Sequence, residues 1–123
     1  MKIATIIVRT VFGLAFVFFG ANILFPFLPV PPMEGHAAEF NNALGATGYM
    51  KVIGACQFLG GLFLLIGKFV PLGLTLLGPV VVNILCFHIF IDRSGLPIAL
   101  IVSALALFLL WRYRVSFAGL VKP

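Results

Sequence analysis

Long runs of apolar residues alternate with short polar or proline-containing breaks along most of the chain. A helix that crosses a membrane needs about 20 mostly apolar residues, and four segments approach or reach that length. They cover residues 4–25, 49–67, 70–91 and 96–113. The sequence therefore predicts four transmembrane helices within one domain, residues 1–123.

Proline, glycine and charged residues mark where these segments end. Pro26 stops the first segment, and the proline-rich stretch 27–32 favours an extended path. Only Lys68 and Phe69 separate the second segment from the third, so we expect a tight hairpin there. Residues 92–95 form a compact polar turn before the fourth segment.

The one long connection, from Pro26 to Thr47, contains apolar residues at helical spacing, flanked by polar ones. The apolar positions are Ala37, Phe40, Ala43 and Leu44. This pattern predicts a short amphipathic helix that lies on the bilayer or covers the end of the long helices. The predicted fold is an all-α membrane protein, a four-transmembrane-helix bundle with a short amphipathic outer-loop helix.

Composition supports this class of protein. Hydrophobic residues make up 63% of the chain and charged residues 9%, with a mean hydropathy of +1.24. Because these few charged residues cannot cover the surface of a soluble domain, most of the surface is expected to face lipid. The net charge of +5 comes from basic residues scattered singly between apolar runs, so no nucleic-acid partner is predicted.

The basic residues predict the orientation of the chain in the membrane. With four spans, six of the basic residues fall on one side of the membrane and two on the other. The larger set is Lys2, Arg9, Lys68, Arg112, Arg114 and Lys122, and the smaller set is Lys51 and Arg93. Because basic residues favour the cytoplasmic side, both termini are predicted to be cytoplasmic. The chain is then a multi-pass protein of a bacterial-type inner membrane, with all three acids outside.

Small residues recur at spacings of three, four or seven within the spans, which keeps them on one side of each helix. They are Gly13 and Gly20; Gly54, Gln57 and Gly61; and Ala99, Ser103 and Ala106. Helices in lipid pack through such small residues because their backbones can then approach closely. These stripes are the predicted inward faces of a compact four-helix bundle.

Three polar side chains inside the predicted spans are candidate contacts in the membrane interior, where polar groups are costly. Arg9 either extends its guanidinium to the inner interface or faces the helices as a contact for an anion or headgroup. Gln57 and Asn83 reach similar depths in the hairpin centred on residue 69, which predicts a hydrogen bond between them. The alternative is that one of these amides binds a polar ligand such as a quinone carbonyl.

Two pairs of histidine and acid lie on the predicted outer side. His88 and Asp92 are four residues apart, so on a continuing helix Asp92 is predicted to orient His88 and favour its protonated form. His36 and Glu39, three residues apart, form an outer-loop polar pair. These residues predict either an interfacial polar network or a site that handles protons or a ligand. They lack a known metal-ligand signature, so no metal site is predicted.

Several short motifs resemble those of the DoxX-like family of small four-helix membrane proteins. They are Arg9-x-x-x-Gly13 and Gly20 in the first helix, then Gly60-Gly61-Leu62 and Leu65-Ile66-Gly67-Lys68-Phe69 at the second hairpin. The resemblance implies a four-helix membrane fold and an association with membrane redox complexes, including a thiosulfate:quinone oxidoreductase. The chain departs from the family pattern at Gln57, where many members have an acid, and at Ile23, where they have a lysine.

The preferred interpretation is a DoxX-like inner-membrane protein that serves as a partner or accessory subunit of a membrane complex, with a redox-linked complex as one candidate. No cofactor signature is evident, although quinone is a candidate ligand. The alternative is a quinone- or lipid-binding oxidoreductase subunit. Its ligand-binding residues would be Arg9, Gln57, Asn83, His88 and Asp92.

Membrane lipid, another membrane protein or a second copy of the chain are the expected partners. Whether the chain is itself an enzyme stays open at this point. A small-solute transporter is favoured less, because coupled transport usually uses an acid within the membrane and the predicted spans have none in their interiors.

Overall fold

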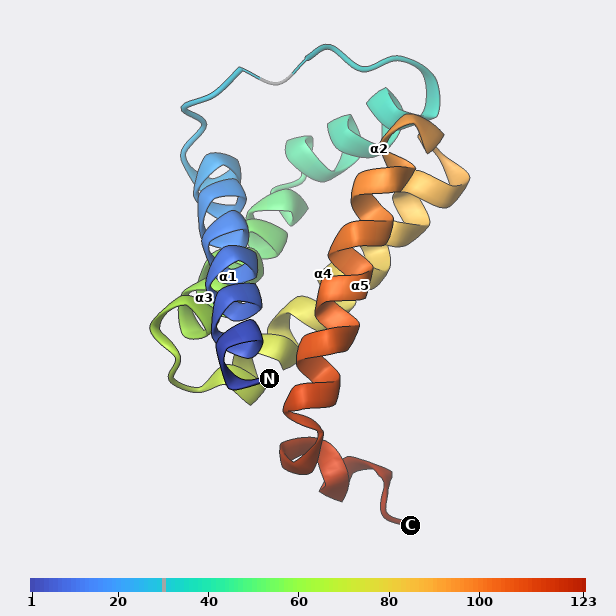
Figure 1. The fold of residues 1–123 in the computed structure, drawn as a ribbon. Helices are drawn as coiled ribbons and strands as arrows, with labels where there is room; N and C mark the ends of the chain where they lie inside the picture. Colours follow the sequence, from blue (N-terminus) through green and yellow to red (C-terminus); the bar gives the residue numbers. More distant parts are fainter. Residues whose placement is uncertain (30) are drawn as a thin grey trace.

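In the computed structural model, which describes residues 1–29 and 31–123, these residues form helices and turns but no strand (Figure 1). Four helices are long and apolar enough to cross a membrane. They are α1 (Lys2–Leu24), α3 (Tyr49–Ile66), α4 (Val70–Phe90) and α5 (Leu96–Arg112). The shorter elements are α2 (Gly35–Ala46) and the 3-10 helices η1 (Arg93–Gly95) and η2 (Arg114–Val121). The bounds of the four predicted long helices are confirmed to within two residues at either end.

The first long helix ends where the sequence predicts, at the residue before Phe25 and Pro26. The side chain of Asn22 secures this end, because its Oδ1 accepts hydrogen bonds from the backbone N–H groups of Phe27 and Leu28, both at 3.0 Å. The described residues that follow, as far as Glu34, form neither helix nor strand. Residue 30, within the stretch predicted to be extended, lies outside the described residues.

The predicted tight hairpin joins α3 to α4. Gly67 ends α3 in the left-handed region at φ 74°, a conformation that glycine adopts without steric cost. Phe69 precedes α4 and is also left-handed, at φ 58°. The reversal therefore takes only three residues, and Pro71 occupies the first turn of α4, where its missing N–H is not needed.

Glycine residues bring the backbones of α1 and α3 into contact (Figure 1). A Cβ atom added at Gly61 would lie 2.7 Å from the backbone nitrogen of Val17 on α1. At the other end of the interface, a Cβ added at Gly20 would lie 2.6 Å from the backbone nitrogen of Phe58. Neither position has room for a side chain, so the predicted small-residue faces of these two helices are confirmed.

The helix α3 uses a different glycine for α4. A Cβ added at Gly60 would lie 3.0 Å from the carbonyl oxygen of Gly73, and a Cβ added at Gly73 would lie 2.9 Å from the carbonyl oxygen of Gly60. Beside these contacts, Leu64 and Leu77 are completely enclosed, and they belong to an apolar core shared by four helices. The core residues are Phe12, Phe16, Leu64, Val70, Leu74, Leu77, Val80, Val81 and Leu109.

The last long helix, α5, is the least covered. Buried residues make up 11% of its span, against 28–33% for the other three. It packs on α4 and meets α1 near its C-terminal end. There the Nε of Arg112 donates a hydrogen bond of 2.8 Å to Oγ1 of Thr5, joining the two ends of the chain.

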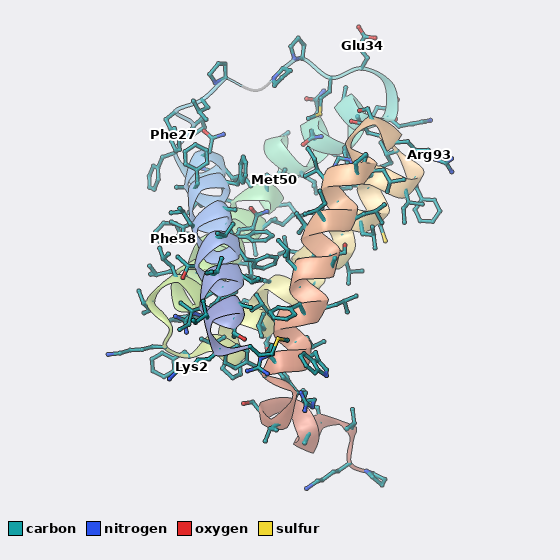
Figure 2. The ribbon with its side chains drawn as sticks, viewed as in Figure 1. Lys2, Phe27, Glu34, Met50, Phe58 and Arg93 are labelled. Carbon is teal, nitrogen blue, oxygen red and sulfur yellow. The ribbon has the colours of Figure 1, made fainter. Side chains whose placement is uncertain are left out.

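All three acidic residues lie at one end of the long helices, and six of the eight basic residues lie at the other. Both termini and the α3–α4 turn lie at one end, in the lower part of Figure 1, while α2 and the α4–α5 turn lie at the other. Figure 2 shows Lys2 at the first end and Glu34 and Arg93 at the second. We call the first the basic end, with Lys2, Arg9, Lys68, Arg112, Arg114 and Lys122, and the second the acidic end, with Glu34, Glu39 and Asp92.

Candidate functional site

A hollow between α1, α4 and α5, which we call the α1–α4–α5 groove, has a volume of about 260 Å³. Its lining is almost wholly apolar and includes Phe12, Leu74, Leu77, Val81, Ala106 and Leu107. The polar exception among the side chains is Ser103, whose Oγ is buried and has no hydrogen-bond partner in the described part of the chain. Such a groove suits an acyl or isoprenoid chain, or an apolar helix with a polar group opposite Ser103.

Gln57 lies on the buried face of α3, with 8% of its surface exposed. It is placed between Gly54, which contacts α1, and Gly60, which contacts α4. Gln57 is therefore a buried polar group at the helix junction, and it does not line the α1–α4–α5 groove.

The predicted hydrogen bond between Gln57 and Asn83 is not formed. Asn83 is exposed, and its Nδ2 donates instead to the carbonyl oxygen of Pro79 at 2.9 Å, one turn earlier in α4. The hairpin predicts similar depths for the two amides, but the rotation of α4 leaves Asn83 exposed and turned away from α3. A short polar side chain turned away from neighbouring helices commonly bonds to its own backbone.

His88 contacts Asp92 through the backbone and not through the carboxylate. Its Nδ1 lies 2.9 Å from the carbonyl oxygen of Asp92, and because a carbonyl only accepts, Nδ1 carries the donated proton. The prediction that the carboxylate orients His88 is therefore wrong. Its physical reason is that α4 ends at Phe90 and Asp92 is extended, at φ −133° and ψ 93°, so the helical superposition of positions 88 and 92 is lost.

The carboxylate of Asp92 accepts hydrogen bonds within the turn to which Asp92 belongs. Its Oδ1 accepts hydrogen bonds from the hydroxyl and the backbone N–H of Ser94, and so caps η1. These two bonds hold the pKa of Asp92 below its usual 3.8, and the nearby His88 adds a smaller effect in the same direction. The His88 ring also fills the space above Gly95, where an added Cβ would overlap the imidazole. Asp92 and His88 together stabilise the α4–α5 turn.

The predicted pair of His36 and Glu39 is present on α2. Nδ1 of His36 lies 3.2 Å from Oε2 of Glu39, with 86% and 75% of the two side chains exposed. Pairs so open to solvent contribute little to stability. Phe40 places α2 against the end of α4, because its ring centroid lies 5.2 Å from that of Phe87. Among residues 1–29 and 31–123, no three His, Cys, Asp or Glu side chains are grouped so that they could hold a metal ion.

Arg9 lies at the other end of the molecule. Its guanidinium packs on the backbone of Gly67 at the α3–α4 turn. The basic end is thus separated by the length of the helices from the α4–α5 turn, which contains Asp92 and is contacted by His88 (Figure 1). The structure consequently does not bring the predicted ligand-binding residues into one cavity.

The sequence assigned Ser103 to a packing stripe and did not single it out as a site residue. The signal that could have found it is that Ser103 is the one hydroxyl or amide side chain within 96–112, the least covered helix. Its place beside Phe12 of α1 and Gly78 of α4 depends on which helices meet α5, and that is not written in the α5 sequence.

Comparisons of this chain with protein families, curated proteins and solved structures find no match. The resemblance to the DoxX-like family therefore stays a prediction from short motifs.

Proposed function

We propose that this chain is a DoxX-like integral protein of the bacterial inner membrane that acts as a noncatalytic accessory subunit, with both termini in the cytoplasm. In this proposal the four long helices form a membrane-embedded bundle, and α2 lies at its outer surface. The unequal distribution of basic residues between the two ends supports the orientation.

The observation that carries the accessory role is the exposure of α5 together with the unpartnered hydroxyl beside it. A serine hydroxyl in hydrocarbon gains from a hydrogen bond to a neighbouring helix. The buried Oγ of Ser103 has no such partner within the described chain, and the residue lines the α1–α4–α5 groove. A transmembrane helix of a partner subunit, packed along α5, would cover the groove and supply an acceptor.

Photocrosslinking in native membranes tests this role. A photoreactive amino acid replaces Leu107, which lines the α1–α4–α5 groove and is 66% exposed, and the matched control replaces Phe19, which is 57% exposed on α1. We expect a covalent adduct with another polypeptide from position 107 only. Adducts with lipid alone at position 107, or the same polypeptide at both positions, would refute docking through α5.

A second candidate function, a quinone- or lipid-binding subunit, is favoured by the shape of the same groove. Its volume of about 260 Å³ is close to the lower limit of about 300 Å³ typical of ligand pockets, and its apolar lining suits an isoprenoid or acyl chain. The polar contact would then come from Ser103 and not from the five residues expected from the sequence.

Extraction and mass spectrometry of the purified protein test the second candidate. Binding predicts about one quinone or lipid retained per chain, and a Ser103→Leu variant that fills the groove should lose it. The matched control is Ser116→Leu, in the exposed η2 segment. Retention that is equal in both variants would place the bound molecule outside the groove.

A further inference from the structure

Arg9 is a cation held partly inside the helix packing at the basic end. A Cβ added at Gly67 would lie 2.9 Å from its Nη1 and 3.0 Å from its Cζ, so the guanidinium rests directly on the backbone of the α3–α4 turn. The Nε of Arg9 is buried and has no hydrogen-bond partner among the residues described. Because an unpaired cationic donor within a membrane span is costly, an anionic acceptor at this position would stabilise the protein.

The acids of this chain cannot provide that acceptor. Glu34, Glu39 and Asp92 all lie at the acidic end, and the ion pair found within the described residues, between His36 and Glu39, lies there too. The C-terminal end of α3 offers only the partial negative charge of its last carbonyl groups. The basic end therefore keeps a net positive charge around the α3–α4 turn.

The same turn presents groups suited to the interface between hydrocarbon and lipid headgroups. Lys68 follows Gly67 directly and is exposed, and Phe69 is 66% exposed beside it. The Phe69 ring contacts Phe63 of α3, with ring centroids 5.7 Å apart. Basic residues next to the end of a membrane-spanning helix attract anionic headgroups, and an exposed apolar ring beside them favours contact with hydrocarbon. The anions available at this interface are the phosphates of phospholipids.

We propose that Arg9 and Lys68 form a binding site for the phosphate of an anionic phospholipid at the α3–α4 turn. Arginine donates several hydrogen bonds in a planar fork that matches phosphate oxygens, while lysine adds a mobile charge. Phe69 and the apolar surface of α3 flank the turn and would hold the start of the acyl chains, which favours a lipid over free phosphate. The site depends on the membrane-spanning helices and not on the accessory role.

Native mass spectrometry of the purified chain in detergent tests the site by titration with phosphatidylglycerol, phosphatidylcholine or inorganic phosphate. The variants are Arg9→Gln and Lys68→Gln, with Arg114→Gln as the matched control. The Arg114→Gln substitution removes the same charge from the C-terminal segment at the same end, where the Arg114 guanidinium lies over the ring of Trp111 at 5.0 Å. Lys68 is exposed, so Lys68→Gln keeps the test decisive even if Arg9→Gln does not fold.

General attraction to a negative surface weakens about fivefold with each basic residue removed, wherever that residue lies. A specific binding site at Arg9 and Lys68 instead predicts a loss of at least about tenfold in phosphatidylglycerol affinity for Arg9→Gln and Lys68→Gln. The loss for Arg114→Gln should be about fivefold or less. The wild type should bind phosphatidylglycerol at least about tenfold more tightly than phosphatidylcholine. Equal losses in all three variants, equal binding of the two lipids, or equally tight binding of inorganic phosphate would each overturn the proposal.

Discussion

Replacing Gly61 with alanine tests whether direct backbone contact holds α1 against α3. The added Cβ would lie 2.7 Å from the backbone nitrogen of Val17 and 2.8 Å from the carbonyl oxygen of Gly13. Ordinary contacts of this kind begin at 3.4 Å, and neither atom belongs to a flexible side chain that could turn aside. The two helices would therefore have to separate along the interface.

Adding a carbon to a packed interior typically costs about 1–3 kcal/mol. We expect a loss of about 2 kcal/mol for Gly61→Ala, because both opposing atoms are backbone. For a chain of this size that corresponds to a Tm lower by about 6 °C or more. Gly61→Leu should lower the Tm further, and by more than Leu64→Ala, because a branched side chain forces the backbones apart whereas a cavity leaves them in place.

The assay is thermal unfolding of each variant in detergent, followed by circular dichroism. Gly78→Ala is the matched control, because it makes the same change within α4 where nothing lies within 4 Å of the added carbon. Its Tm should equal or exceed that of the wild type, since alanine is the better helix former. A Tm for Gly61→Ala equal to that of Gly78→Ala would refute the backbone contact.

Three further predictions concern the two ends of the molecule. Reporters fused after Lys68 or Pro123 should be active only in the cytoplasm, and activity outside at Pro123 would reverse the proposed orientation. The pKa of Asp92 lies below its usual 3.8, so its carboxylate stabilises the folded state above about pH 4 and this contribution is lost as pH falls through the lowered pKa. Asp92→Asn should therefore lower the Tm at pH 7 but match the wild type near pH 2, and an equal difference at both pH values would contradict the capping role. Thr5→Val should cost about 1 kcal/mol by removing the acceptor of Arg112, while Thr5→Ser keeps it, and equal Tm values for the two would show that the bond is unimportant.

The sequence alone predicts the four long helices and the small-residue faces of α1 and α3, while the structure shows that these two faces contact each other. Each long helix satisfies its own backbone hydrogen bonds, so a long apolar run is sufficient to predict it. The spacing of Gly13 and Gly20, like that of Gly54 and Gly61, also follows from the chain, because helical geometry places such residues on one side. The α3–α4 turn is also predictable from neighbouring residues alone, since Gly67 is followed within four residues by Pro71.

Tertiary structure decided which polar groups meet. The sequence predicts similar depths for Asn83 and Gln57, but only the rotation of α4 shows that Asn83 turns outward and bonds to Pro79. Similarly, the end of α4 at Phe90 gives His88 a backbone carbonyl in place of a carboxylate. These outcomes depend on helix rotations and ends set by packing between segments far apart in the chain, whereas hydrophobic length and periodicity are properties that each segment has by itself.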